Sequence, residues 1–287
     1  MKMKKLFSIL LVLTMSMALL VGCGNSDTTT TPEGGTDGQT TELSGSVSTD
    51  GSTSMEEIIG ALGEQFQADT GVTVSYNPTG SGAGIEAVSN GSCDIGLASR
   101  ALTDEEKANL TETTVALDGI AIIVNAENTI TDLTLDQIKQ IYTGEINDWS
   151  EVNGTGGQIA RIIRESGSGT RDGFESITGT EDACIGDQEL SSTGAVIEAV
   201  RTTPGAIGYA SLSAVTGQEG ITVLTVDGVA CTEETILDGS YAIQRPFVFA
   251  TRTGEALSDA AQAFFDFATS TAANDLIAAA GAVPVAE

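Results

Sequence analysis

The segment Arg161 to Glu175, RIIRESGSGTRDGFE, joins an apolar strand, a turn of glycines and hydroxyl residues, and the start of a helix. The first N–H groups of a helix have no partner within the helix and carry the positive end of its dipole. The turn Gly167-Ser168-Gly169-Thr170 can therefore cradle an oxyanion with backbone and hydroxyl donors. Arg164, near the end of the strand Ile159 to Arg164, can add a planar guanidinium fork.

Two earlier turns have the same chemistry. Asp50 to Ser54 precedes a predicted helix, with Ser54 and Glu57 at capping-box spacing, and Thr79 to Gly84 precedes a second helix. Serine and threonine also begin ordinary helices, so each turn alone is compatible with a purely structural role. Because all three turns follow predicted strands, we expect three helix N-termini at the carboxyl ends of strands, where α/β folds bind ligands.

The composition argues against nucleotide binding and catalysis. No lysine follows any of the three turns, as a Walker A loop requires, and GSGAG lacks the GxGxxG spacing, so the ligand is expected to be small. The chain has no histidine, which removes the commonest general base and the commonest transition-metal ligand. Ser168 is not in a GxSxG elbow, because Ser166 stands where the first glycine belongs. We therefore predict no enzyme, no cofactor and no metal site.

The N-terminus predicts where the protein works. Lys2, Lys4 and Lys5 precede an apolar run from Leu6 to Val21, as in a signal peptide. The next residues, up to Cys23, resemble a lipobox, the bacterial lipoprotein signal whose cysteine is acylated. Residues 23–42 are rich in Thr, Gly, Asp and Ser, a composition typical of a disordered tether. We expect residues 1–22 to be removed and the protein to be held by lipid on the extracytoplasmic face of the cell membrane; an uncleaved anchor helix is the alternative.

The charge of the chain limits the molecules that it can bind, and its cysteine content limits the disulfides that it can form. Removing three lysines from the 12 basic residues leaves nine against 40 acidic residues, a formal charge of −31 on the mature chain. Nucleic acid and anionic lipid surfaces are repelled, so an anion must be bound by local donors. Cys93, Cys184 and Cys231 form an odd set without CxxC spacing, and we expect at most one disulfide among them.

Strand-like and helical stretches alternate over residues 43–287, a pattern typical of α/β folds with parallel sheets. The predicted strands are 43–49, 72–76, 94–98, 114–125, 159–164, 207–210, 221–226 and 247–251. The predicted helices are 55–66, 85–88, 104–109, 135–142, 170–177, 195–200, 255–268 and 272–280.

Several segments, taken together, resemble the phosphate-binding lipoproteins of bacterial ABC transporters. They follow the family order and are GSTS at 51–54, YNPTGSGAGIEAV at 76–88, DIGLASRALTDEE at 94–106, LDGIAIIVN at 117–125, LTLDQIKQIYTGEINDWSEV at 133–152, RESGSGTRDGFE at 164–175 and PGAIGYASL at 204–212. The resemblance covers nearly all of residues 43–287.

The resemblance implies a two-lobed, type II periplasmic-binding-protein-like fold with a ligand cleft between the lobes. Lobe one would comprise residues 43–124 plus 244–287, and lobe two residues 125–243. It implies a monomer that captures inorganic phosphate and delivers it to membrane permease subunits of an ABC transporter. The phosphate contacts carried over are Thr53, Ser54, Ser81, Arg164, Ser168, Gly169 and Thr170, and the turn after residue 98 adds Ser99 and Arg100.

Two positions depart from the family pattern. Relatives carry an aspartate after the ASx turn to accept the proton of phosphate, whereas Arg100 stands here. We expect Asp118 to be the acceptor, with Arg100 adding positive charge; the alternative is that Asp118 only pairs with Arg100. Ser166 replaces an acid that holds the binding arginine in some relatives, and Glu165 or Asp172 can substitute for it.

The roles of some other residues, and the function itself, have more than one interpretation. Arg171 can face either the ligand or these acids, and Arg161, three residues before Arg164 in a strand, is expected on the opposite face in a structural role. Trp149 is expected to pack in lobe two. Alternative functions are a binding protein for sulfate or molybdate, and a phosphate-sensing or adhesive lipoprotein without a transport role.

Overall fold

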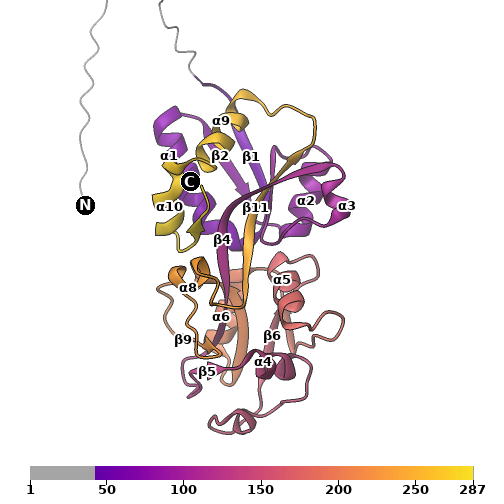
Figure 1. Cartoon of the computed structure of the whole chain (residues 1–287), viewed down its shortest axis with the longest axis vertical. Coiled ribbons are helices and arrows are strands. Elements are labelled where there is room, and N and C mark those ends of the chain that lie inside the picture. The colour runs from indigo at the N-terminus through magenta and orange to yellow at the C-terminus, as the bar shows by residue number, and fades with distance from the viewer. Residues whose placement is uncertain (1–42, 287) are drawn as a thin grey trace, which may run out of the picture. The chain divides into compact units, whose positions relative to one another are not determined.

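The computed structural model describes residues 43–286, which lie in one compact unit. Strands and helices alternate along most of the chain (Figure 1). The strands are β1 (Ser46–Gly51), β2 (Thr73–Asn77), β3 (Ile95–Ala98), β4 (Leu110–Asn125), β5 (Asp132–Leu133), β6 (Ala160–Arg164), β7 (Gln188–Leu190), β8 (Ala206–Ser211), β9 (Ile221–Val223), β10 (Thr225–Val226), β11 (Gln244–Arg252) and β12 (Val283–Pro284). The α-helices are α1 (Glu56–Thr70), α2 (Ser81–Ser89), α3 (Asp104–Lys107), α4 (Leu135–Tyr142), α5 (Gly169–Thr178), α6 (Thr193–Thr202), α7 (Leu212–Val215), α8 (Glu233–Leu237), α9 (Asp259–Ala268) and α10 (Asn274–Ala279).

Eight of these strands form one continuous path in the order β2-β1-β3-β11-β4-β8-β6-β7. β9 and β12 pair with β4 outside this path, and β5 and β10 form a separate two-stranded sheet. β1 is parallel to β2 and β3, and β6 is parallel to β7 and β8, as the sequence predicts. The expectation of parallel sheets is wrong for the middle of the path, because β11 runs antiparallel to both β3 and β4, and β4 runs antiparallel to β8. The reason is that β11 is the returning strand: it comes from late in the chain and inserts between β3 and β4.

Among the described residues, two large hydrophobic cores lie along this path, and a smaller third cluster includes Ile85 of α2 and Val248 of β11. One surrounds β1 and β3 and includes Val47, Ile58 and Phe264, and the other surrounds β6 and β8 and includes Ile162 and Tyr209. β4 and β11 run side by side through the middle of the molecule (Figure 1). Apolar residues of both strands belong to the core around β1, whereas the C-terminal half of β4 belongs to the core around β6. The two lobes predicted from the sequence correspond to this architecture, and their stated limits stay a prediction.

β4 passes from one core to the other within a few residues. Val115 and Ala116 pack in the core around β1, whereas Ile120 to Val124 pack in the core around β6. The residue at the crossing, Asp118, is paired in register with Arg245 of β11. The crossing of β4 and β11 therefore holds a charged pair between two apolar regions.

The first two turns pack closely against neighbouring backbone because glycines occupy the contact positions. Gly51 has φ +139°, and a Cβ on this residue would lie 2.2 Å from the carbonyl oxygen of Leu97. A Cβ on Gly84, in α2, would lie 2.4 Å from the carbonyl oxygen of Asp50. Only glycine lets α2 pack directly on the end of β1, so the helix start is held where the strand ends.

Local signals identify most helices but not all of their caps. α4 has the predicted limits, with a capping box between Thr134 and Gln137. The capping box expected between Ser54 and Glu57 is wrong, because α1 begins after Met55 and has no side-chain cap. The Ser54 hydroxyl instead bonds to side chains from distant segments. The short helices α7 and α8 and the strands β5, β7 and β12 have no counterpart among the sequence-based predictions.

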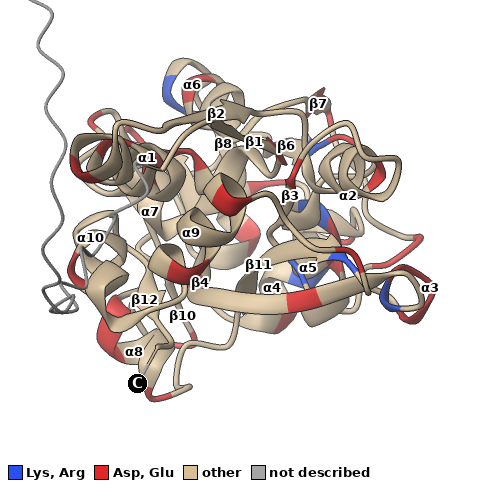
Figure 2. Cartoon of the chain, turned by 90° about the horizontal axis from the view of Figure 1, so that it is seen from above, with Lys and Arg blue, Asp and Glu red and all other residues tan. Residues whose placement is uncertain are grey.

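Acidic side chains far outnumber basic ones across the fold (Figure 2). The predicted signal peptide, Cys23 and the tether to residue 42 lie outside the described residues. Within residues 43–286 no helix has both the length and the apolar character needed to cross a membrane.

We predict that Gly84→Ala lowers the free energy of unfolding by about 1 to 3 kcal/mol, because its methyl group meets backbone atoms that cannot move independently. Gly60→Ala is the matched control, since Gly60 lies in α1 and a Cβ on this residue would meet no other segment within 4 Å. The control is expected to stabilise the protein by about 0.5 to 1 kcal/mol. Urea unfolding of both variants measures the effect, and equal stabilisation by the two alanines would contradict the packing argument.

Candidate functional site

The first turn is a one-turn 3-10 helix, η1 (Thr53–Met55), placed directly after β1. The Ser54 N–H donates to the Ser52 hydroxyl at 3.2 Å, and the Tyr76 hydroxyl donates to the Ser52 carbonyl at 2.8 Å. These bonds fix the turn from both sides. The hydroxyls of Thr53 and Ser54 are consequently held in the protein interior, where both residues are buried.

The second turn begins α2 and is tied to the first. The Gly80 N–H donates to the Gly51 carbonyl at 2.8 Å. The Ser81 hydroxyl accepts a bond from the Ser99 N–H at 3.0 Å and lies 3.2 Å from the Ser99 hydroxyl. Ser81 and Ser99 are each buried, so the end of β3 and the start of α2 present their hydroxyls together.

The third turn begins α5 and approaches the second turn closely. Ser168 caps α5 by accepting from the Arg171 N–H. A Cβ on Gly169 would lie 2.4 Å from the Ser81 hydroxyl and 2.8 Å from the Ser99 hydroxyl, so this position requires glycine. The Gly82 N–H donates to the Gly167 carbonyl at 2.9 Å. The second and third turns are thus in direct contact.

Aromatic rings hold the third turn in place. Phe174 of α5 stacks on Tyr209 of β8 with ring centroids 4.1 Å apart, and Tyr142 meets the edge of both rings. The Tyr209 hydroxyl accepts a bond from the Arg164 N–H at 3.2 Å. Burial raises the pKa of Tyr209 well above its ordinary value, so the phenol stays neutral in this position. The aromatic group therefore fixes both the strand that ends at Arg164 and the helix that follows it.

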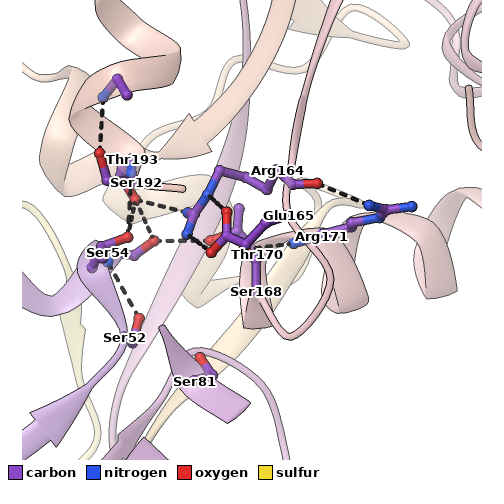
Figure 3. Close-up of polar contacts among 12 residues, drawn as sticks. Ser52, Ser54, Ser81, Arg164, Glu165, Ser168, Thr170, Arg171, Ser192 and Thr193 are labelled. Atoms are coloured by element: carbon purple, nitrogen blue, oxygen red, sulfur yellow. Dashed lines mark hydrogen bonds and ion pairs between the residues drawn. The ribbon is translucent and has the colours of Figure 1, made fainter. Parts of the chain in front are cut away.

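A fourth helix start joins the site at α6, which Ser192 caps. The Thr193 hydroxyl lies 3.0 Å from the Thr53 hydroxyl and 3.0 Å from the Ser54 hydroxyl. The Ser54 hydroxyl also lies 2.9 Å from the Thr170 hydroxyl (Figure 3). Thr53, Ser54, Thr170 and Thr193, which we name the hydroxyl cluster, thus link η1, α5 and α6 through buried oxygens.

Arg164 supplies the positive charge of the hydroxyl cluster. Its side chain is 2% exposed, and its Nη1 donates to the Thr193 hydroxyl at 3.2 Å (Figure 3). Its Nε and Nη2 donate to the two carboxylate oxygens of Glu165 at 2.9 and 2.8 Å. This two-pronged pair neutralises the arginine while fixing the orientation of its fork.

Asp118 occupies a separate buried position at the crossing of β4 and β11. Its Oδ1 accepts from the Ser211 hydroxyl at 2.6 Å, and its Oδ2 accepts from Nε and Nη2 of Arg245 at 3.0 and 2.9 Å. Burial raises the pKa of Asp118, and the charge of Arg245 opposes that rise. The Ser211 hydroxyl lies 2.7 Å from the Ser213 hydroxyl, which donates to the Ser54 carbonyl at 3.4 Å. A chain of hydroxyls therefore connects Asp118 to the first turn.

The arrangement is suited to binding an oxyanion. Four helix starts contribute N–H groups with positive dipole ends, and buried hydroxyls and a fixed guanidinium face the same place. The bonds that the described residues make to the hydroxyl cluster come from hydroxyls, from N–H groups and from Arg164, none of which is a general base. Nothing in these contacts activates a nucleophile.

Comparison with known proteins places this chain in a family. The profile of the PBP superfamily domain matches residues 29–272. The phosphate-binding protein PstS of Bacillus subtilis (strain 168) is 30% identical over 249 residues, covering 85% of this chain and 82% of the relative. The chain belongs to the PstS family of the PBP superfamily. Its relatives are named as binding proteins, which agrees with the prediction that the chain is not an enzyme.

Solved structures agree with this placement. A structure from Clostridium perfringens, described as a candidate phosphate ABC transporter substrate-binding protein with bound phosphate, is 39% identical. It has a TM-score of 0.80 and covers 84% of this chain and 100% of its own. An ABC-type phosphate transport receptor from Vibrio cholerae is 30% identical with a TM-score of 0.68, covering 83% of this chain and 100% of its own. The PBP-like α/β fold predicted from the sequence is confirmed.

The structure brings together most of the predicted site residues. The three turns predicted from the sequence meet, and the residues they bring together are Thr53, Ser54, Ser81, Ser99, Ser168, Gly169 and Thr170. Arg164 joins them through Thr193. Asp118 lies apart from these contacts and reaches them through Ser211 and Ser213.

Arg100 is placed differently from the expectation. Its Nη1 and Nη2 donate to the Glu106 carboxylate at 2.8 Å, and its Nε donates to Asp172 at 2.9 Å. That Arg100 contacts phosphate and adds positive charge there stays a prediction. The alternative that Asp118 pairs with Arg100 is wrong, because Arg245 is the cation bound to Asp118. The reason is the insertion of β11 next to β4, which no local pattern around residue 100 reveals.

Ion pairs show which acids the arginines at 161, 164 and 171 contact. Glu165, rather than Asp172, holds Arg164. Arg171 pairs with Glu175 and Glu189, which are not the acids Glu165 and Asp172 that the sequence suggested. Arg161 is structural as expected: its guanidinium donates to the carbonyls of Ile141 and Ile146 and pairs with Asp187. Trp149 is buried and its indole N–H donates to the Gly205 carbonyl at 3.0 Å, a packing role.

Two residues of the site were missed. Thr193 follows Ser191 and Ser192 and precedes Gly194, the same glycine-and-hydroxyl pattern as the three predicted turns, so this signal was present in the sequence. Arg245 had no such signal, because its role depends on its register with β4. Within residues 43–286, Cys93, Cys184 and Cys231 are free thiols, and burial raises their pKa values, that of Cys93 to about 11 and those of Cys184 and Cys231 to about 12.

Proposed function

We propose that the protein captures inorganic phosphate at the hydroxyl cluster and delivers it to the permease of an ABC transporter. The observation that carries the proposal is the meeting of four helix starts and their hydroxyls around one buried arginine, Arg164. The relatives support it, because they are named as phosphate-binding proteins and one structure contains bound phosphate.

The proposed phosphate contacts come from all four turns. Charge-assisted bonds come from Arg164, and neutral donors come from hydroxyls and from N–H groups at the helix starts. The proposed set is Thr53, Ser54, Ser81, Ser99, Arg164, Ser168, Gly169, Thr170 and Thr193. Hydrogen bonds that involve a charged partner contribute about 1.5 to 3 kcal/mol each, so several of them outweigh the repulsion of an acidic chain.

Release and capture are proposed to use relative movement of two lobes, residues 43–124 plus 244–287 and residues 125–243. The bond between Gly82 and Gly167, and that between Ser54 and Thr170, each join a turn of one lobe to a turn of the other. A phosphate ion that bonds to both sets of donors stabilises this closed arrangement by its higher affinity for it. The closed form then docks on the permease.

Asp118 is proposed as the acceptor of the phosphate proton. Its carboxylate is fully buried, and Ser211 and Arg245 hold it in one orientation. A buried carboxylate accepts a hydrogen bond from protonated phosphate, whereas it repels sulfate, which has no proton to donate. Asp118 thereby provides the selectivity between the two anions.

We also propose that Cys23 is lipidated and anchors the protein to the extracytoplasmic face of the cell membrane. The proposal rests on the basic residues, apolar run and lipobox-like sequence that precede Cys23. Residues 23–42 would then separate the folded part from the bilayer. The folded part is proposed to act as a monomer.

The first prediction concerns the ligand. The full-length chain, unfolded and refolded to strip bound anion, is expected to bind phosphate tightly in calorimetry, with sulfate unable to displace it. Thr193→Val is expected to weaken binding about 10-fold or more, because it removes a hydroxyl and leaves Nη1 of Arg164 without its partner. Thr202→Val, at the exposed end of the same helix, is the control and is expected to bind like the wild type.

The outcomes separate the alternatives. Displacement of phosphate by sulfate or molybdate would favour a different oxyanion, and heat from none of these anions would remove the assigned ligand. Tight phosphate binding without stimulation of phosphate uptake by the permease in membrane vesicles would favour a sensing or adhesive lipoprotein.

Asp118→Asn is expected to reduce the preference for phosphate over sulfate at least about 10-fold, because an amide can donate to the unprotonated anion and no longer repels it. Competition calorimetry at pH 7 measures the ratio. Asp187→Asn is the matched control, since it removes the carboxylate partner of another buried arginine, Arg161, outside the site. An unchanged ratio in Asp118→Asn, with the protein folded, would rule out this residue as the acceptor.

Cys23→Ala is expected to move the protein from the membrane fraction to the soluble fraction, because the lipid chains that hold it are lost. Labelled palmitate incorporated by the wild type should be absent from this variant. Cys184→Ala is the control and is expected to remain in the membrane fraction. Retention of Cys23→Ala in the membrane would instead indicate an uncleaved anchor helix.

A further inference from the structure

Arg245 has a buried guanidinium nitrogen whose bonding is incomplete. The residue is 4% exposed, and its Nε and Nη2 both donate to Asp118. Its Nη1, however, is buried with no hydrogen-bond partner among residues 43–286. A buried donor on a charged group that makes no bond is costly, so such atoms are rare in folded proteins. The position of Nη1 therefore points to a partner outside these residues.

The geometry of the guanidinium directs Nη1 away from Asp118. The group is planar, and Nε and Nη2 form the edge that faces the carboxylate, so Nη1 lies on the opposite side. The ring of Phe247, 5.4 Å from Cζ, supports one face of the group. Asp118 and Phe247 thus hold the arginine in a fixed orientation with one nitrogen left to donate.

The stem of Arg245 packs against the first turns of α5. A Cβ on Gly173 would lie 3.6 Å from Cδ of Arg245. Gly173 is four residues, about one helical turn, beyond Gly169, which touches the hydroxyls of Ser81 and Ser99. The guanidinium therefore lies near the positive end of α5, the same helix start that contributes Thr170 to the hydroxyl cluster.

A second path connects Arg245 to the site through its partner Asp118. Its partner Asp118 is bonded to Ser211, and through Ser213 this network reaches the Ser54 carbonyl. Arg245 therefore packs directly on the helix that follows the third turn, and Asp118 is connected to the first turn through Ser211 and Ser213.

Electrostatics favours an anion near this group. Burial lowers the pKa of Arg245, the charge of Asp118 opposes this, and the positive charge of Arg164 lowers the pKa further. The two arginines thus repel one another, although each is paired with an acid. An anion bound between them relieves this repulsion.

We propose that Arg245 is a second anion-binding arginine: Nη1 donates to an oxygen of the bound tetrahedral anion, while Asp118 holds the guanidinium in place. This inference rests on the proposed phosphate site. Because Arg245 and Asp118 are register partners at the crossing of β11 and β4, the anion is bonded to the strands that join the two cores. Binding then acts directly on the segments about which the lobes move.

The test compares affinity with stability in Arg245→Lys. Lysine keeps a positive charge to pair with Asp118 but has no planar fork, so it cannot bond to Asp118 and the anion in the same way. We expect phosphate affinity of the full-length chain to fall about 10- to 100-fold, with the unfolding temperature of the anion-free protein nearly unchanged. Arg252→Lys, on the same strand and paired with Glu255, is the control and is expected to bind like the wild type.

A second comparison removes the buried charge that a single substitution leaves behind. Asp118→Asn with Arg245→Met is charge-neutral, and we expect it to bind phosphate at least about 10-fold more weakly than Asp118→Asn alone. Affinity of Arg245→Lys within threefold of the wild type, or equal affinity of the single and double variants, would overturn the role of Arg245. Absence of phosphate binding by the wild type would instead overturn the proposed function on which the role depends.

Discussion

The hydroxyls of Ser54 and Thr170 lie 2.9 Å apart although 116 positions separate them in the chain. One belongs to a turn packed beside the core around β1, and the other belongs to a turn packed beside the core around β6. Such a contact forms only when the two cores are brought close together, and β4 and β11 join them by running side by side between them. The bond from Gly82 to Gly167 and the contacts of Thr193 depend on the same placement.

Charge is the second constraint on the site. The chain has 40 acidic and 12 basic residues, so its overall field repels an anion. A lone buried cation would offset this, but burying an unpaired charge is costly, and each buried arginine near the site is paired with an acid: Arg164 with Glu165 and Arg245 with Asp118. The pairs fix the direction of the remaining N–H groups. Attraction for an anion therefore comes from oriented donors rather than from excess positive charge.

Local patterns predicted the fold and much of the site because their causes are local. The turns at Gly51 and Gly167 need positive φ angles, and hydroxyl residues beside them begin helices, so the strand, turn and helix order is visible in sequence. The predictions failed where a side chain had a choice of partners. Ser54 bonds to Thr170 and Thr193 instead of capping α1, and Arg100 pairs with Glu106 and Asp172 instead of with Asp118.

The sequence by itself determined the α/β class, the three glycine-and-hydroxyl turns and the strand that ends at Arg164, since backbone conformation and helix starts depend on neighbouring residues. Tertiary structure alone decided that β11 inserts antiparallel beside β4, that Thr193 joins the hydroxyl cluster, and that Arg245 is the partner of Asp118 from 127 positions away. These outcomes depend on which distant strands pair and in which register. Strand pairing is selected by the burial of whole apolar faces, so it cannot be read from any one segment.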